Sequence, residues 1–208
     1  MKKLLVISLL VFSSSLFASI DIVGGQGYGT FRLAGAGTTN AASIMYVGVQ
    51  FNKYIEFRYV SLDTSIRMPI LPFRLYDINY HLRSEGGVNK YTYYDSDVFG
   101  VNLTLPVNDH WSVSALYGLG RSRISEITKN ATASGDEATI LHMGLIQLVD
   151  IQTAMHFKVS DALVFSPAVG CMIHFLDKKS PYSNALSVYT AVTVSYLLGK
   201  SSGEDAKH

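Results

Sequence analysis

A β-hairpin pattern between Asp95 and Ile124 restricts the possible folds of this chain more than any other stretch. Large apolar residues alternate there with small, uncharged ones on both sides of a Pro-Val-Asn-Asp-His turn at 106–110. A soluble sheet usually turns its large residues inward, but here the second face is mostly Gly, Ser, Thr and Asn. The pattern therefore indicates a lipid-facing wall around a narrow polar lumen, with Trp111 at the membrane boundary. The apolar face consists of Phe99, Val101, Leu103, Leu105, Trp111, Val113, Ala115, Tyr117 and Leu119.

The N-terminus has the parts of a secretory signal peptide. Two lysines precede an apolar run from Leu4 to Phe12, and small residues lead to a cleavage position after Ala18. We therefore expect residues 1–18 to be a signal peptide and the mature chain to begin at Ser19. The apolar run is shorter than the roughly 20 residues of a spanning helix, and no later run is long enough either. A mature membrane protein of this sequence would be a barrel, because closure satisfies every backbone group in lipid.

Composition limits the classes of function. The 208 residues carry a formal net charge of +1, with 48% hydrophobic and 16% charged residues. The chain is too apolar for a disordered segment and has no basic excess for nucleic acid. Cys171 is the only cysteine, which excludes an internal disulfide and a cysteine-based metal site. We expect one folded unit without cofactor or metal.

Period-two alternation marks eight strands, with dense glycines blurring the first. Turns near Asn52, Asn108 and Ser160 are short, whereas connections near Gly37, Arg74, Ala131 and Ser180 are longer. This predicts an all-β, eight-stranded antiparallel up-and-down transmembrane barrel. The barrel would occupy residues 19–199, with both termini on the periplasmic side and a polar tail at 200–208. The expected strands are 22–35, 45–51, 55–60, 98–105, 111–120, 149–157 with a continuation over 139–148, 163–175 and 186–198.

Two strand–turn–strand stretches resemble a known family. They read GVQFNKYIEFRY at 48–59 and GVNLTLPVNDHWSV at 100–113. Both resemble the OmpA-type family of small eight-stranded barrels in the outer membrane of Gram-negative bacteria. The resemblance implies a structural or surface-interaction role in the cell envelope. It also implies a monomer in contact with outer-membrane lipid, lipopolysaccharide and the assembly machinery. We expect no peptidoglycan-binding domain after the barrel, and Tyr196 is not the terminal aromatic residue of the family's insertion signal.

The inward face offers a small set of polar and charged side chains. Because buried charges need partners, we predict a structural network that fills the lumen, with a gate or proton-active site as the alternative. An interior filled in this way would not serve as a general diffusion porin, although a narrow ion-conducting barrel stays an alternative. The predicted lumen residues are Arg32, Gln50, Glu56, Arg58, Asn102, Asp150, Gln152 and His156.

Two other classes of protein are alternatives to this interpretation. Ser183-Asn184 resembles part of the His-x-Ser-Asn motif of lipid A deacylases, but Pro181 occupies the histidine position. No carboxylate on the last strand could orient a base, so we expect no enzyme. A soluble lipocalin-like carrier would place large apolar side chains inside, against the small residues of the central hairpin.

The longest connection is the expected recognition segment. Asp63 to Tyr93 exceeds what a membrane crossing requires, and we predict a surface loop with some local β structure. Loops on a rigid scaffold often carry binding residues, so any surface ligand is expected here. The equal alternative is a lipopolysaccharide-facing loop without a protein partner. The segment carries Arg67, Arg74, Asp77, Arg83, Glu85 and Lys90 among several tyrosines.

Overall fold

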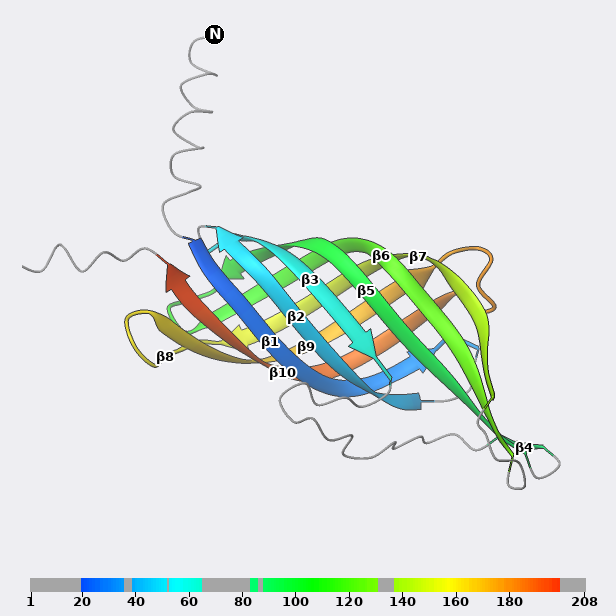
Figure 1. Ribbon diagram of the computed structural model, residues 1–208. Coiled ribbons are helices and arrows are strands. Elements are labelled where there is room, and N and C mark those ends of the chain that lie inside the picture. Colours follow the sequence, from blue (N-terminus) through cyan, green and yellow to red (C-terminus); the bar gives the residue numbers. More distant parts are fainter. Residues whose placement is uncertain are drawn as a thin grey trace, which may run out of the picture.

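The computed structural model describes residues 20–35, 39–51, 53–64, 83–85, 88–130 and 137–198 (Figure 1). The expected signal peptide, the polar tail and most of the segment between Asp63 and Arg83 lie outside these residues. In the described part of the chain, no helix is long and apolar enough to cross a membrane.

The described chain forms a closed, antiparallel β-barrel with eight wall strands, as the sequence predicts. β10 pairs with β1 along the whole of β1, which closes the sheet. β8 continues the wall of β7 beyond His156, and the short β4 pairs only with β5. The strands are β1 (Ile20–Leu33), β2 (Thr39–Phe51), β3 (Ile55–Asp63), β4 (Arg83–Glu85), β5 (Val88–Pro106), β6 (Trp111–Asn130), β7 (Glu137–Met155), β8 (Phe157–Lys158), β9 (Leu163–Leu176) and β10 (Asn184–Leu198).

Pairing around the wall gives the stagger of the barrel. Starting at Tyr59, the pairing partners through β5, β6 and β7 lead to Phe175 on β9. The partners through β2, β1 and β10 lead instead to Phe165 on the same strand. Residues 165 and 175 differ by ten positions, so the shear number is 10. Eight strands with this stagger tilt strongly, and their interior is just wide enough for side chains to fill.

The two ends of the barrel differ in their connections. At one end, which we call the turn end, Val107–His110 and Val159–Ala162 form tight turns. Lys53 belongs to a third turn there and has φ 58°, the left-handed conformation that tight hairpin turns often need. Ile20 and Leu198 pair with each other at this end. The opposite end, which we call the loop end, carries the longer connections that the sequence predicts, of which 177–183 is fully described.

Three strands continue past the loop end of their neighbours. β5, β6 and β7 pair over Val88–Tyr94, Ile124–Asn130 and Glu137–Leu145, where β3 and β9 have already ended (Figure 1). We call these segments, together with β4, the extension. The sequence assignment of Val88–Tyr93 and Ser125–Asn130 to loops is therefore wrong, while the continuation of a strand over 139–148 is confirmed. The assignment failed because alternation between apolar and small residues reports a lipid-facing wall, and backbone pairing can continue without it.

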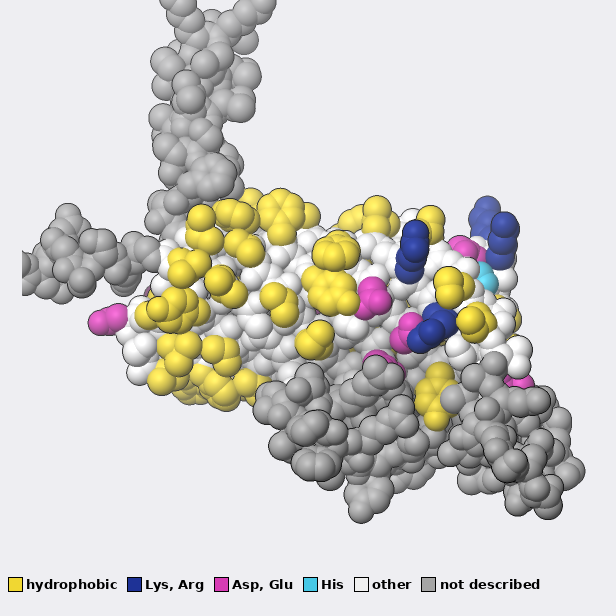
Figure 2. Space-filling model, in the orientation of Figure 1, with side chains coloured by type: hydrophobic (Ala, Val, Ile, Leu, Met, Phe, Trp, Pro, Cys, Tyr) yellow, Lys and Arg dark blue, Asp and Glu magenta, His cyan; other side chains and the backbone are white. Residues whose placement is uncertain are grey.

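The exterior carries the apolar band that the hairpin pattern predicts. Phe99 and Leu119 leave 71% and 57% of their surface exposed, although both are large and apolar. Figure 2 shows yellow apolar side chains gathered toward the turn end and charged ones toward the loop end. Such a band suits a bilayer and would otherwise expose a large apolar surface to water. Exposed aromatic residues lie near the turn ends of five strands and match the expected interfacial girdle. They are Tyr54, Trp111, Phe157, Phe165 and Tyr196.

Candidate functional site

Seven of the eight predicted lumen residues do lie on the inward face. Five are buried, whereas Gln50 and His156 are half-buried near the turn end. They come from β2, β3, β5 and β7 and from the break between β7 and β8, so only closure of the sheet brings them together. The five buried residues are Glu56, Arg58, Asn102, Asp150 and Gln152.

Arg32 is the exception, because its side chain lies on the outer surface near the loop end of β1. Its neighbours Phe31 and Leu33 are the residues that point into the barrel, where each is almost fully buried. The sequence prediction assumed that large apolar residues face lipid, which would have turned Arg32 inward. Pairing of β1 with β2 and β10 fixes the opposite orientation.

Glu56 and Arg58 form the centre of the polar interior. Arg58 donates from Nε to Glu56 Oε1 at 2.8 Å and from Nη2 to Glu56 Oε2 at 2.6 Å. Asn102 donates a further hydrogen bond to Glu56 Oε2 at 3.1 Å. Both charged side chains are almost completely buried, and the two-point geometry compensates part of their desolvation. Glu56, Arg58 and Asn102 are therefore joined by hydrogen bonds inside the barrel.

A second group surrounds Asp150. The hydroxyl of Tyr189 donates to Asp150 Oδ2 at 2.7 Å, and Arg58 Nη1 donates to Gln152 Oε1 at 3.3 Å. The guanidinium of Arg58 also lies 4.6 Å from the ring centroid of Tyr46, a cation–π contact. These contacts connect β2, β3, β7 and β10 across the lumen. Period-two alternation assigns both tyrosines to the inward face, but sequence reasoning did not include them in the polar network.

Interior glycines provide the space for these large polar side chains. A Cβ atom on Gly25 would overlap the ring of Tyr46, and one on Gly170 would overlap the ring of Tyr189. A Cβ atom on Gly48 would likewise meet the carboxylate of Glu56. The glycines that blur the alternation of the first strand are thus partly explained by the close approach of a neighbouring side chain.

His156 connects two walls at the turn end. Its Nδ1 lies 2.9 Å from Ser166 Oγ, and its Nε2 lies 2.8 Å from Ser112 Oγ. Both serines are buried on the inward face. His156 is therefore a hydrogen-bonded lumen residue. In the described part of the chain, no three His, Cys, Asp or Glu side chains are arranged to hold a metal ion.

The loop half of the lumen is largely apolar, with Ser96, Ser122, Ser187 and His174 as buried polar members, and the sequence did not predict this apolar filling. Large aliphatic side chains from all around the wall meet there and are almost fully buried. We call this group the apolar layer, and it occupies the space where a polar channel would have to continue. The rule of a polar lumen failed here, because a narrow barrel can also be filled as a soluble core is filled. Its largest aliphatic members are Ile44, Leu62, Ile124, Leu148 and Met172, while the buried Leu116 lies between its pairing partners Asn102 and Asp150 of the polar network.

An aromatic group lies in the same half of the lumen. Phe31 stacks on Tyr94 with 4.5 Å between the ring centroids. Tyr94 reaches across the lumen, and its hydroxyl lies 2.8 Å from Nδ1 of the fully buried His174. Phe31 meets the edge of the His174 ring at 6.0 Å between centroids. The three rings thus join β1, β5 and β9 within the lumen.

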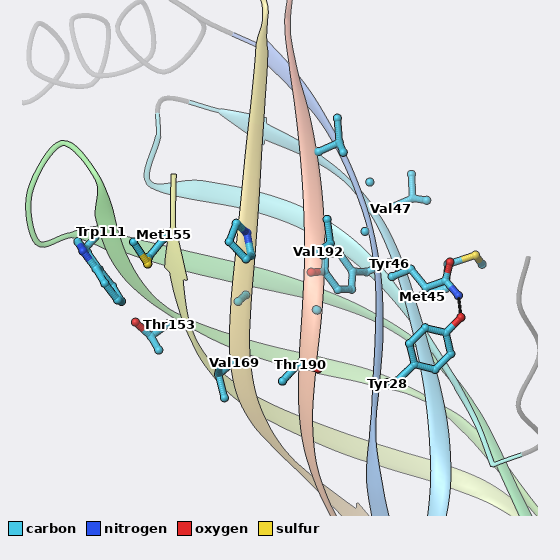
Figure 3. Close-up of a pocket in the computed structure, with 17 residues that line it drawn as sticks. Tyr28, Met45, Tyr46, Val47, Trp111, Thr153, Met155, Val169, Thr190 and Val192 are labelled. Atoms are coloured by element: carbon cyan, nitrogen blue, oxygen red, sulfur yellow. Dashed lines mark hydrogen bonds between the residues drawn. The ribbon is translucent and has the colours of Figure 1, made fainter. Parts of the chain in front are cut away.

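A shallow hollow of about 980 Å³ occupies the outer wall over β1, β9 and β10 (Figure 3). Its floor is formed where outward residues are small, as at Gly24 and Thr190. Figure 3 shows Tyr28 and Met45 toward one side of it and Trp111 and Met155 toward the other. The amide of Gln26, which also lines the hollow, donates to the Tyr28 hydroxyl. That bond partly satisfies a polar side chain on an apolar wall.

Comparison with solved structures identifies the fold. No protein-family model matches the sequence, and no curated protein matches it either. The crystal structure of Neisserial surface protein A matches with a TM-score of 0.50 and 10% identity, over 85% of this chain and 96% of that one. A major outer membrane protein from Thermus thermophilus has a TM-score of 0.49, 10% identity and coverages of 86% and 98%. The chain has the fold of the small eight-stranded outer-membrane barrels.

Proposed function

We propose that this protein is a non-conducting barrel of the outer membrane with a structural and surface-interaction role. The single observation that carries the proposal is the apolar layer, which fills the lumen across its loop half. A solute would have to displace buried aliphatic side chains and the rings of Phe31, Tyr94 and His174. Because the lumen is filled, the outer wall and the loop end are the surfaces that can carry a function.

The extension supports a surface role. Ile140 and Met143 on β7 leave 57% and 60% of their surface exposed, and Leu145 leaves 69%. On the loop-end side of Ile146, the edge of β7 has no pairing with β9, because β9 ends at Leu176, the partner of Ile146. Exposed apolar side chains beside an open strand edge are typical of a protein-interaction surface. We therefore extend the expected recognition segment from the connection at 63–93 to the neighbouring face of β7.

We also propose that the protein is not a hydrolase. Among the described residues, the two histidines nearest the loop end have other contacts: His174 Nδ1 lies 2.8 Å from the Tyr94 hydroxyl, and His142 Nε2 lies 3.4 Å from Asp177 Oδ1. Ser183 is exposed, but no hydrogen bond from its hydroxyl to a histidine is present among the described residues. A lipid A deacylase would need that base. Incubation of the purified barrel with lipid A should release no fatty acid, and release above a heat-denatured control would contradict the proposal.

Conductance measurements test whether the apolar layer closes the lumen. The purified protein in planar bilayers should give no large, stable steps, because the apolar layer excludes water and ions. A variant with Leu62→Ser, Leu148→Ser and Met172→Ser serves as comparison and should leak more than the parent. Large steps from the parent protein would overturn the non-conducting assignment. Mass analysis of the membrane-inserted protein should also place its first residue at Ser19.

The surface role needs a separate measurement. Cells lacking the protein should take up more of a hydrophobic dye, and the parent gene should restore the barrier. A variant with Ile140→Asn and Met143→Asn should restore the barrier but lose adhesion to surfaces or to other cells. Leu119→Asn serves as a matched control, because this apolar residue lies in the lipid-facing band instead of the extension. If the extension variant adheres as the parent does, the recognition surface lies elsewhere.

A further inference from the structure

We propose that the outer wall over β9, β10 and β1 binds one anionic lipid, with its headgroup at the loop end and its acyl chains directed toward the hollow. The inference rests on the proposed outer-membrane role and deepens it. Two separate observations point to the same wall. One is the distribution of charge at the loop end, and the other is the shape of the apolar wall below it.

The loop-end rim over β9, β10 and β1 is basic. Arg32 on β1 and Lys178 and Lys179 on the 177–183 connection are all exposed. The hydrogen bond from Ala34 N to Asn184 O, at 2.9 Å, joins the end of β1 to the start of β10 and to that connection. Three cations are thus presented along one stretch of rim. No carboxylate within the described ranges forms an ion pair with any of them.

Among the described residues of this rim, the one acidic side chain is occupied elsewhere. Asp177 Oδ1 accepts hydrogen bonds from the backbone N–H groups of Lys179 at 2.7 Å and Ser180 at 3.1 Å. The same oxygen lies 3.4 Å from Nε2 of His142. Asp177 therefore shapes its own connection instead of neutralising the lysine side chains. The rim keeps more positive than negative charge.

The opposite wall has the reverse balance. Three exposed or half-exposed carboxylates lie near the loop ends of β3 and β5, against two arginines on β6. Arg123 is already paired with Asp95 at 2.7 Å. An anionic headgroup is thus favoured on the β9–β10–β1 side and disfavoured on the β3–β5 side. The residues of the opposite wall are Asp63, Asp95, Asp97, Arg121 and Arg123.

The wall below the basic rim suits acyl chains. Leu186 is the pairing partner of Arg32, and outward residues of β10 continue downward through Val188 and Thr190 to Val192. The six residue steps from Leu186 to Val192 span roughly 20 Å along the strand, about the length of a lipid acyl chain. Thr190 and Val192 line the hollow, where small outward residues leave space against the wall (Figure 3). Chains that follow β10 from the rim therefore end in the hollow.

Fluorescence quenching by brominated lipids tests the site. Trp111 is the only tryptophan, so Trp111→Phe gives a background for one reporter at a time. Leu186→Trp places the reporter beside Arg32, and Phe99→Trp places it on the opposite wall. Each protein is reconstituted in phosphatidylcholine vesicles that contain brominated phosphatidylglycerol or brominated phosphatidylcholine. The reporter at Leu186 should show at least about fivefold preference for the anionic lipid, as expected when one basic residue acts at a membrane surface. The reporter at Phe99 should show none.

Substitutions assign the preference to the rim. Arg32→Gln, Lys178→Gln and Lys179→Gln together should abolish the preference at the Leu186 reporter. Arg121→Gln with Arg123→Gln, the matched control on β6, should leave it unchanged. Inorganic phosphate in the buffer should not remove the preference; if it does, the rim recognises a free anion and the lipid assignment is wrong. Equal quenching by both lipids at the Leu186 reporter, or a preference that survives the triple substitution, would also overturn the proposal. Equal quenching by the two lipids is measured in a protein with Arg32, Lys178 and Lys179 unchanged, so misfolding of the triple variant cannot explain that result.

Discussion

The turn half and the loop half of the lumen are filled in opposite ways inside one continuous wall. In the turn half, Arg58, Glu56 and Asp150 are held by hydrogen bonds, and glycines make room for their partners. In the loop half, aliphatic side chains and the Phe31–Tyr94 stack pack as they would in a soluble core. In both halves, contact with lipid requires apolar side chains on the outward face. The interior must only be filled without unpaired charge, so either chemistry is acceptable there.

The largest expected effect comes from breaking the ion pair of the turn half. Arg58→Met should lower the free energy of unfolding by about 3–5 kcal/mol, because Glu56 keeps a buried carboxylate without its partner. Urea unfolding in lipid vesicles measures the change. The double substitution Arg58→Met with Glu56→Gln is the control and should recover much of the loss. A single variant as stable as the parent would mean that the network contributes little.

Truncation in the loop half should come next. Phe31→Ala removes a fully buried ring from the aromatic stack and should cost about 3 kcal/mol, since a cavity remains in a packed layer. Phe99→Ala on the outer wall is the matched control, and lipid chains can fill the space that it leaves. The same unfolding measurement applies to both. Equal losses for the two variants would indicate that the apolar layer is loosely packed.

Replacing an interior glycine of the turn half by alanine should have a smaller effect on stability. Gly170→Ala places a Cβ atom against the ring of Tyr189 and should cost about 2 kcal/mol by overpacking. Gly24→Ala adds the same atom on the outer wall, where nothing lies within 4 Å, and should change stability by less than about 0.5 kcal/mol. Heat-modified migration on a gel gives a rapid comparison. A neutral Gly170→Ala would show that Tyr189 can move aside.

The smallest effect compares similar hydrogen bonds in the two halves. Tyr94→Phe removes the bond to His174 in the loop half, and Tyr46→Phe removes the 2.6 Å bond to Thr193 in the turn half. Each should cost about 1 kcal/mol, the usual net value of a neutral hydrogen bond. Thermal unfolding of the two variants, side by side, is the measurement. A much larger loss for Tyr94→Phe would mean that the aromatic group, more than the aliphatic packing, stabilises the loop half.

Much of the polar site could be predicted from single residues. Polar side chains that alternate with large apolar ones identify the inward face of each strand. The buried residues predicted in this way are Glu56, Arg58, Asn102, Asp150 and Gln152. Their partners Tyr46 and Tyr189 fall on the predicted inward faces, but neither was assigned to the network, because tyrosine suits lipid interface and lumen alike. The apolar layer was missed for a related reason. Where both faces of a strand are apolar, hydrophobicity does not distinguish inside from outside.

The amino-acid pattern alone is enough to predict the wall: eight strands, their order, the short turns and the apolar band follow from period-two alternation and from the need to satisfy every backbone group in lipid. The orientation of β1, the length of the extension and the filling of the lumen depend instead on how the strands pair and pack. Arg32 illustrates the reason. Its own neighbours predict that it points inward, but pairing with β2 and β10 turns it outward, because register is fixed by the partner strands on both sides.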